Sequence, residues 1–360
     1  MLRKKESDLE ALLKQWDGEE VIIRYDKPSG AWIIIAIHNT RLGTATGGTR
    51  MRHYPDLKAA AQDALKLAES MSFKYAVANF PRGGGKAVIH LPDNFDELQR
   101  PEILKRYGRL IHQLGGFFET GPDVGTSSED MDIIAETGDP YIFCRTPAKG
   151  GAGDSGPATA FGVYNGILAV CTHLFGQASL EKKRILVQGA GSVGEPLIDL
   201  LLEAGAEVMF SDLDDRTVRL LQDKKGLTFI HPDKIFDTPC DIFAPCALGG
   251  ILNKDSIPRL KCLAVAGGAN NQLAEPADAE RLWGRQILYA PDYAINIGGA
   301  MAIIGIETMG WSQKEADENV SSVQQTLKQI FTTAEAQGIN TDAAARQIAR
   351  KRLYEIQDYS

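Results

Sequence analysis

The sequence predicts an α/β protein of two domains, the second of which is built on a parallel sheet. Its 360 residues exceed what one hydrophobic core usually serves, so two domains are expected. In the second half of the chain, short apolar runs alternate with helical patterns, which is typical of parallel strands joined by crossover helices. Residues 146–157 are rich in Gly, Ala, Ser and Pro and mark either the domain boundary or a hinge.

The composition is that of a globular protein, with 44% hydrophobic and 24% charged residues. A net charge of −8 argues against nucleic acid or an anionic membrane as the main partner, and favours small molecules or other protein chains. The five cysteines lack CxxC spacing, which favours a reducing compartment without structural zinc or disulfides. The amphipathic N-terminus lacks the apolar core of a signal peptide, and the apolar window 294–306 is too short to span a bilayer. A cytoplasmic protein with no bound metal is therefore expected.

The first half is expected to contain an N-terminal helix, a hairpin and two further helices. The hairpin follows from two apolar runs that flank the turn signal Lys-Pro-Ser-Gly. The two further helices follow from apolar residues that recur at helical spacing. In chain order these elements are the helix over 1–16, the strands 21–25 and 31–37, a helix that starts at 57 and carries Lys74, and a helix over 100–114.

The stretch MSFKYAVANFPRGGGK, residues 71–86, places two lysines twelve positions apart and ends on three glycines and Lys86. A folded domain tolerates three consecutive glycines where the backbone turns through positive φ or presses against other atoms. Lys86 would then lie near a bound ligand, or else in a solvated surface turn. Lys74 falls on or beside the buried stripe of its helix, where a lysine requires an anionic partner. Its charge would lower the pKa of Lys86.

A dinucleotide fingerprint follows the strand expected at 184–188. The run Gly-Ala-Gly-Ser-Val-Gly, residues 189–194, opens a helix, and the next strand, 207–210, ends near Asp212. The glycines allow a tight turn and bring a pyrophosphate close to the helix N-terminus. Asp212 would accept hydrogen bonds from ribose hydroxyls and repel a 2′-phosphate, so NAD is predicted over NADP. Arg216 is the one nearby residue because of which NADP is not excluded.

Two more strands are expected at 241–244 and 263–266, each followed by a glycine-rich loop. In a doubly wound sheet such loops line the ligand crevice, so Asn270 and Asn271 either face the nicotinamide or substrate or simply form a turn. From Ser312 onward the chain is expected to be an amphipathic helix. The apolar face of that helix comprises Val320, Val323, Leu327, Ile330 and Phe331.

Five long segments carry a resemblance to a known family. They are GGTR (47–50), MSFKYAVANFPRGGGKAVI (71–89), TGPDVGT (120–126), DIFAPCALGG (241–250) and APDYAINIGG (290–299). Through them the chain resembles the Glu/Leu/Phe/Val dehydrogenase family over nearly its whole length, most of all the leucine and phenylalanine dehydrogenases. The resemblance implies reversible NAD-dependent oxidative deamination of an L-amino acid to a 2-oxo acid and ammonia, by a homo-oligomer.

The resemblance also implies the architecture. An N-terminal α/β substrate-binding and oligomerisation domain, 1–145, would precede a Rossmann NAD-binding domain, 150–330, with the active site in the cleft between them. The C-terminal helix, about 335–360, would pack back on the first domain.

By the family pattern, Lys86 and Asp123 are implied to be catalytic, and Lys74 to bind the substrate carboxylate. The chemistry agrees, because hydride leaves Cα only from a neutral amine beside a carboxylate, and hydrolysis of the iminium needs a base near neutral pH. The residues implied to bind substrate are Lys74, Gly47, Gly48, Met71, Leu42, Asn270, Asn271, Ala294 and Ile297. Those implied to bind the cofactor are Arg50, Ser155, Thr159, Gly189, Gly191, Ser192, Val193, Gly194, Asp212, Leu213, Cys246, Ala247, Leu248, Ala269 and Asn270.

The substrate is left open between several apolar amino acids. Leu42 stands where glutamate-specific relatives have a lysine, so the pocket formed with Met71, Ala294 and Ile297 is expected to take phenylalanine, leucine or another branched-chain residue. A tryptophan or broad-specificity dehydrogenase is the alternative, and the effect of Arg82 beside the site cannot be predicted. A non-catalytic nucleotide-binding relative is a further alternative, which the presence of the complete catalytic set disfavours.

Overall fold

The computed structural model describes residues 8–355, apart from the side chains of residues 8 and 224. The chain forms two compact units. Among the described residues, unit 1 comprises 8–153, 303–310 and 349–355, and unit 2 comprises 154–302 and 311–348. The expected N-terminal helix is seen as α1 (Asp8–Gln15), while its residues 1–7 and residues 356–360 of the expected C-terminal helix lie outside the described residues.

Unit 1 contains a five-stranded sheet in the order β1-β2-β4-β3-β5. The predicted hairpin is confirmed, because β1 and β2 pair antiparallel with Glu20 opposite Ile37. β4 is antiparallel to β2, whereas β3 is parallel to both β4 and β5. The strands are β1 (Glu20–Asp26), β2 (Ala31–Asn39), β3 (Ala45–His53), β4 (Gly83–Leu91) and β5 (Phe118–Pro122).

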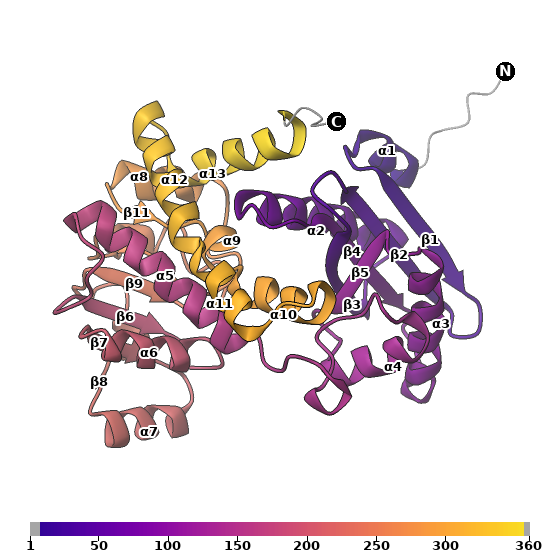
Figure 1. Ribbon diagram of the computed structural model, residues 1–360, viewed down its shortest axis with the longest axis horizontal. Coiled ribbons are helices and arrows are strands. Elements are labelled where there is room, and N and C mark those ends of the chain that lie inside the picture. Colours follow the sequence, from indigo (N-terminus) through magenta and orange to yellow (C-terminus); the bar gives the residue numbers. More distant parts are fainter. Residues whose placement is uncertain (1–7, 356–360) are drawn as a thin grey trace. The chain divides into compact units, whose positions relative to one another are not determined.

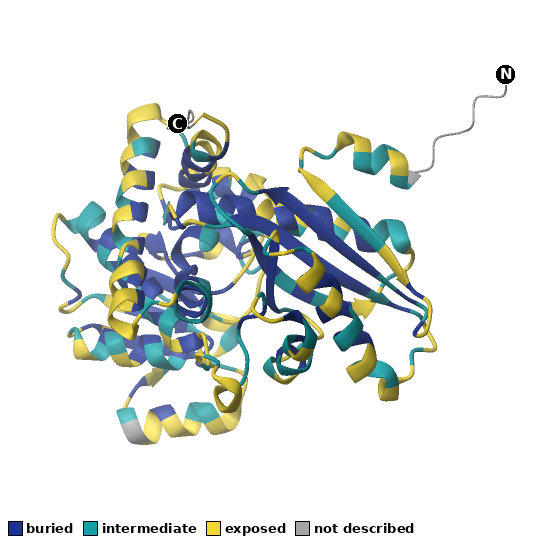
Figure 2. Ribbon diagram, turned by 45° about the vertical axis from the view of Figure 1, so that its right-hand side comes forward, coloured by how far each residue is buried: buried dark blue, intermediate teal, exposed yellow. Residues whose placement is uncertain are grey.

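Helices cover both faces of this sheet (Figure 1). Alternate residues of β4 point to opposite faces, so Val88 packs against α2 while Ala87 and Ile89 pack against α3 and α4. The inner strands are buried on both faces, whereas β1 at the sheet edge is largely exposed (Figure 2). The helices predicted from 57 and 100 are confirmed as α2 (Leu57–Val77) and α3 (Arg100–Gln113); α4 (Ser128–Gly138) was not predicted.

The three consecutive glycines lie inside β4 and do not form a turn. None of them has a positive φ. Instead each glycine allows other atoms to approach closely. A Cβ on Gly83 would lie 2.2 Å from the Asn39 carbonyl oxygen, and one on Gly84 would lie 2.1 Å from the Ser72 backbone nitrogen. A Cβ on Gly85 would lie 2.7 Å from the Phe118 ring. Of the two explanations for the glycines, close packing is therefore correct, and Lys86 is a buried strand residue.

Unit 2 contains a six-stranded sheet in the order β11-β10-β9-β6-β7-β8, in which every pair is parallel. When β6 is numbered 1 and the sheet is followed from β8 to β11, this is the strand order 3-2-1-4-5-6 of a dinucleotide-binding sheet. The four strands predicted here are confirmed, and β8 and β11 are additional. The strands are β6 (Arg184–Gln188), β7 (Glu207–Ser211), β8 (Thr228–Phe229), β9 (Ile242–Pro245), β10 (Ala264–Val265) and β11 (Leu288–Tyr289).

Helix α5 (Gly156–Phe175) is long and apolar enough to cross a membrane by length and composition alone. It packs against α6 and α12, and more than half of its apolar window is buried, which is the behaviour of a core helix. The α-helices that follow α5 up to residue 309 are α6 (Gly194–Glu203), α7 (Asp215–Lys225), α8 (Ala277–Gly284), α9 (Asp292–Ile295) and α10 (Gly298–Met309). Residues of α10 from 303 onward belong to unit 1.

The tail after Ser312 forms three helices, not one. They are α11 (Gln313–Ser321), α12 (Val323–Gln337) and α13 (Thr341–Arg350), and the five apolar residues predicted to share a face are all buried. Gly338 ends α12 with a φ of 65°, which explains the break between α12 and α13. The described chain ends in unit 1, where Arg352 Nη1 donates hydrogen bonds to the carbonyls of Ala76 and Val77 at the end of α2.

Candidate active site

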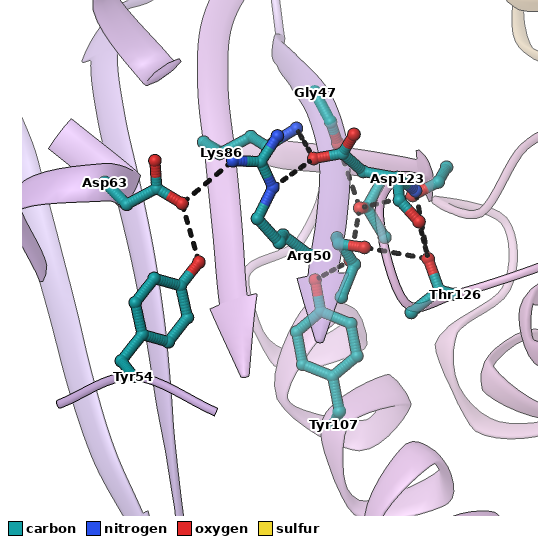
Figure 3. A network of polar contacts seen from close by, with 11 residues as sticks. Gly47, Arg50, Tyr54, Asp63, Lys86, Tyr107, Asp123 and Thr126 are labelled. Atoms are coloured by element: carbon teal, nitrogen blue, oxygen red, sulfur yellow. Dashed lines mark hydrogen bonds and ion pairs between the residues drawn. The ribbon is translucent and has the colours of Figure 1, made fainter. Parts of the chain in front are cut away.

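A buried ion pair in unit 1 joins the two residues predicted to be catalytic. Lys86 projects from β4 toward α2, and Asp123 directly follows β5. Lys86 Nζ lies 2.7 Å from Asp123 Oδ2, and the exposed fractions of the two side chains are 7% and 23% (Figure 3). An amine and a carboxylate held together out of bulk water can exchange a proton with a bound substrate.

The glycine pair of β3 makes room for Asp123. A Cβ on Gly48 would lie 2.6 Å from the Pro122 carbonyl oxygen and 2.9 Å from Asp123 Cβ, so a larger residue would displace the carboxylate. Thr126 fixes the same turn, because its Oγ1 accepts a hydrogen bond from the Asp123 backbone N–H at 2.9 Å and donates one to the Thr49 carbonyl at 2.8 Å. The turn after β5 is thus tied to β3.

Arg50 connects this pair to a second carboxylate. Its Nε donates to Asp123 Oδ2 at 2.9 Å, the same oxygen that Lys86 contacts, and its Nη1 donates to Asp63 Oδ2 at 2.9 Å. Tyr54 also donates a hydrogen bond to Asp63 Oδ2, at 2.6 Å. Figure 3 shows the five side chains linked by these contacts, with Tyr54 and Asp63 on one side of Arg50 and Asp123 on the other. Arg50 was implied to bind the cofactor; that role stays a prediction, and its place in this network was not foreseen.

The network shifts the pKa of both residues that are predicted to be catalytic. Burial lowers the pKa of Lys86, and the positive charge of Arg50 acts in the same direction, against Asp123 and Asp63, which raise it. Burial alone would raise the pKa of Asp123, but Lys86 and Arg50 outweigh it and hold that pKa below its usual range. The sequence assigned the role of neighbouring cation to Lys74, whereas the cation on the shared carboxylate oxygen is Arg50.

Hydroxyl groups form a second set of hydrogen bonds around β3, on the face of the sheet that is covered by α3. Thr49 Oγ1 lies 2.7 Å from Tyr107 Oη and 2.7 Å from Thr120 Oγ1, and Thr120 donates to the Gly47 carbonyl at 2.9 Å. Sequence reasoning missed Tyr107, Thr126, Asp63 and Tyr54. The sequence offered a signal for Asp63 alone, since this half-buried carboxylate lies next to the apolar stripe of α2.

The other residues of unit 1 that are predicted to bind substrate include Met71, Lys74 and Leu42. Met71 Cγ lies 3.5 Å from the position that a Cβ on Gly47 would take, so Met71 covers the glycine pair. Lys74 is half-buried in the last turn of α2, and Leu42 is half-buried in the turn before β3. Their contacts with a substrate stay predictions.

The charge of Arg82, whose effect the sequence left open, is compensated within unit 1. Its Nε lies 3.4 Å from Glu119 Oε2, and its Nη2 donates to Thr308 Oγ1 at 2.7 Å. Both side chains of the ion pair are largely buried, and burial raises the pKa of Glu119. Arg82 therefore joins β5 to the part of α10 that belongs to unit 1.

The glycine loop of unit 2 has the shape that a pyrophosphate requires. Gly189 has a φ of 90°, and a Cβ there would lie 2.5 Å from Ala247 Cβ. A Cβ on Gly194 would lie 1.8 Å from the Gly189 carbonyl oxygen, so this glycine permits the close approach of α6 to the loop. A Cβ on Gly191 would meet nothing within 4 Å, which leaves the middle of the loop open to a ligand. These positions fit a dinucleotide.

Asp212 lies at the end of β7 and holds the same loop. Its Oδ2 accepts a hydrogen bond from the Ala190 N–H at 2.7 Å, and its Oδ1 accepts one from the Asp214 N–H at 2.8 Å. Each carboxylate oxygen keeps a second lone pair for a ribose hydroxyl. Leu213 and Leu248 are 80% and 64% exposed, and their contacts with the cofactor stay predictions.

The two asparagines after β10 differ in their local structure. Asn271 has a φ of 51° and its carbonyl accepts a hydrogen bond from Gly250, which is the behaviour of a turn residue. Asn270 Oδ1 accepts a hydrogen bond from Asn296 Nδ2 at 2.7 Å, so its amide has a fixed orientation. Asn270 is therefore the better candidate for a ligand contact.

The remaining predicted residues of unit 2 lie close to these loops or inside the core. Thr159 Oγ1 donates to the Ser155 carbonyl at 2.8 Å at the start of α5. Ser192 and Val193 belong to the glycine loop, and Cys246 and Ala247 follow β9. Ala269 follows β10, and Ala294 and Ile297 are fully buried in and after α9. Their contacts with ligands stay predictions. Among the described residues, no cluster of His, Cys, Asp and Glu could hold a metal ion.

The dinucleotide-type sheet of unit 2 and the buried ion pair of unit 1 are the features expected of a dinucleotide-dependent oxidoreductase. Residues 26–139 match the model of the Glu/Leu/Phe/Val dehydrogenase dimerisation domain, and residues 210–359 match the model of Glutamate/Leucine/Phenylalanine/Valine dehydrogenase. The chain belongs to this family and is an amino-acid dehydrogenase. Members of the family use NAD(H), in agreement with the cofactor predicted from the glycine loop.

Its relatives cover nearly the whole chain. It is 40% identical to a leucine dehydrogenase of Thermoactinomyces intermedius over 95% of this chain and 92% of the relative. It is 41% identical to a valine dehydrogenase of Streptomyces coelicolor over 95% and 93%. A crystal structure of L-tryptophan dehydrogenase from Nostoc punctiforme superimposes with a TM-score of 0.87, at 36% identity over 96% of this chain and 98% of that one.

Proposed function

We propose that this protein catalyses the reversible NAD-dependent oxidative deamination of an apolar L-amino acid to its 2-oxo acid and ammonia. The observation that carries the proposal is the 2.7 Å contact between Lys86 Nζ and Asp123 Oδ2 in a largely buried position. Unit 1 would bind the amino acid and unit 2 the NAD. Bound NAD supplies the acceptor for the hydride that leaves Cα.

The side chains of unit 1 would perform the proton transfers. Asp123, whose pKa is held low by Lys86 and Arg50 despite its burial, is a carboxylate that can take a proton from the substrate ammonium group. Lys86, whose pKa is lowered by burial, can be neutral at working pH and take a proton from the water that attacks the iminium. Lys74 would hold the substrate carboxylate by a charge-assisted hydrogen bond.

A branched-chain amino acid is the substrate that the relatives favour, because those at about 40% identity are named leucine and valine dehydrogenases. Leu42 and Met71 supply apolar surface of the required kind in unit 1. Tryptophan is the second candidate, favoured by the similarity to the L-tryptophan dehydrogenase structure. Phenylalanine and a broad specificity remain within the same proposal.

We also propose a homo-oligomer in the cytoplasm. The dimerisation-domain match over 26–139 supports self-association, as does β1, which among the described residues pairs with another strand on one side only. The five free cysteines support a reducing compartment. Light scattering after size-exclusion chromatography tests the oligomer directly, and a monomer at micromolar concentration would refute it.

The test of the proposed function uses the appearance of reduced nicotinamide absorbance with NAD and a panel of L-amino acids. We expect turnover with leucine, valine or an aromatic amino acid, and kcat/KM should rise with pH as Lys86 loses its proton. Lys86→Ala should reduce kcat by roughly 10²–10⁴-fold, the usual contribution of a general base. Lys66→Ala, an exposed lysine on α2, serves as the control and should leave kcat unchanged.

No turnover with any amino acid would instead favour the non-catalytic nucleotide-binding alternative. If Lys86→Ala kept more than about a tenth of the wild-type kcat, the base would have to be another group. Asp123 would then be the candidate for both proton transfers.

A further inference from the structure

Asp63 and Tyr54 form the outer end of the network in Figure 3, and the proposed mechanism gives them no role. Both residues are half-buried, and the Asp63 side chain is 26% exposed. Asp63 Oδ2 accepts hydrogen bonds from Arg50 Nη1 at 2.9 Å and from Tyr54 at 2.6 Å. The hydrogen bond from Tyr54 holds the Asp63 carboxylate in place, and that carboxylate in turn holds the Arg50 guanidinium.

We propose that Asp63 is a positioning residue that sets the protonation state of Lys86 by holding Arg50 between two carboxylates. The proposal rests on the acid/base role proposed for Lys86. Asp63 does not touch the reacting atoms and would act through Arg50.

The shared oxygen of Asp123 is the reason that Arg50 matters. Lys86 Nζ at 2.7 Å and Arg50 Nε at 2.9 Å both approach Asp123 Oδ2, so the two cations share one acceptor. Asp63 accepts a hydrogen bond from the Nη1 end of the Arg50 guanidinium and partly neutralises the charge of Arg50. Without Asp63, Arg50 would be neutralised by Asp123 alone, and the proton on Lys86 would cost more free energy.

The charge balance gives the direction of the effect. With Lys86 protonated, the four groups carry two positive and two negative charges. Removing the charge of Asp63 leaves an excess positive charge beside Lys86, which favours the neutral amine and lowers its pKa further. Asp63 acts in the opposite direction and raises the pKa of Lys86.

The other ionisable groups on this face of the sheet do not replace Asp63. Burial lowers the pKa of His38 on β2 and of His90 on β4, so both imidazoles favour the neutral form. The His90 ring contacts the Tyr54 ring edge-on at 5.9 Å between centroids. Lys74 on α2 and Arg52, whose Cζ lies 5.1 Å from the Tyr54 ring centroid, are further cations. The carboxylates that contact Arg50 and Lys86 are those of Asp63 and Asp123.

The test is the pH dependence of kcat/KM for Asp63→Asn. We expect the acidic limb of the profile to move to lower pH by about 0.5–1 unit, the effect of one partly screened charge several ångströms away. Asp63→Glu keeps the charge and should restore the wild-type limb. Glu69→Gln removes the same charge from an exposed position on the same helix and should leave the limb unchanged. Asp63→Ser, a smaller residue with the same charge change, carries the test should the asparagine variant not fold.

Tyr54→Phe separates charge from packing. It removes one hydrogen bond to Asp63 and leaves all four charges in place, so the limb should stay within about 0.2 unit of the wild-type position. A shift in Tyr54→Phe as large as that in Asp63→Asn would show that local order, not charge, governs Lys86, and would overturn the proposal. An unshifted limb in Asp63→Asn would also overturn it.

A second readout does not depend on turnover. The rate at which cyanate carbamylates Lys86, followed by mass spectrometry as a function of pH, reports the fraction of neutral amine. Asp63→Asn should move this curve to lower pH by the same amount as the kinetic limb. If the wild-type protein oxidised no amino acid, the proposed function would fail, while the carbamylation curve would still support or refute the coupling of Asp63 to Lys86.

Discussion

Substitution of Gly84 by alanine tests the explanation given for the glycine run. The Cβ of alanine would lie 2.1 Å from the Ser72 backbone nitrogen, 2.2 Å from Ser72 Oγ and 2.6 Å from Ser72 Cα. Two of these three atoms are backbone atoms of α2, which cannot move aside by a change of rotamer. Either α2 or β4 must shift, and β4 carries Lys86 two residues further on.

The magnitude follows from this geometry. Overpacking a core by one methyl group costs about 1–3 kcal/mol, and the contact with backbone places Gly84→Ala at the upper end, near 3 kcal/mol. A displacement of about 1 Å at Lys86 would also reduce kcat on the order of 10²-fold. Urea denaturation measures the first effect, and steady-state oxidation of the amino acid measures the second.

Gly284→Ala is the matched control, because a Cβ on Gly284 would meet nothing within 4 Å and no positive φ is required there. That variant should be neutral or more stable by up to about 1 kcal/mol, through the lower entropy of the unfolded chain. If Gly84→Ala unfolded with a free energy within about 0.5 kcal/mol of the wild type, as an ordinary surface substitution does, the close-packing explanation would be wrong.

Three further predictions concern the cofactor, the substrate and the stability of unit 1. Asp212 should give NAD a much higher kcat/KM than NADP, with Asp212→Asn narrowing the ratio; equal efficiency in the wild type would assign the ribose site to a neighbour such as Arg216. Lys74→Ala should raise the amino-acid KM roughly 10–100-fold by loss of a charge-assisted contact, without a change in NAD affinity; an unchanged KM would mean that another group holds the carboxylate. Glu307 accepts hydrogen bonds from the backbone N–H groups of Cys144 at 2.9 Å and Ala152 at 2.8 Å. Glu307→Ala should therefore lower the free energy of unfolding, measured in urea, by about 1–3 kcal/mol, and Glu307→Gln should lower it by less. Equal stability of both variants and the wild type would show that these hydrogen bonds do not stabilise unit 1.

Elements whose signals are local could be predicted from the amino-acid sequence. The β1–β2 hairpin, α2 and the strand–glycine–helix start of unit 2 follow from the period of apolar residues and from turn chemistry within a few positions. Asp212 could be predicted for the same reason, since its distance from the glycine loop is fixed by one helix and one strand. The pair Lys86 and Asp123 came from the family resemblance of the long motifs around them, and their 2.7 Å contact agrees with it.

The role of the glycines and the charges around Lys86 depend on contacts between residues far apart in the chain. Glycine permits a positive φ and close packing equally well, and only the approach of Ser72 and Phe118 distinguishes the two. Arg50 and Asp123 are 73 positions apart in the chain, and Arg82 and Thr308 are 226 positions apart. Such contacts depend on the order of strands in a sheet and on where a distant helix returns. Neither leaves a periodic pattern in the sequence, because the interaction energy of two charges depends on their separation in space and on burial, and not on their separation along the chain.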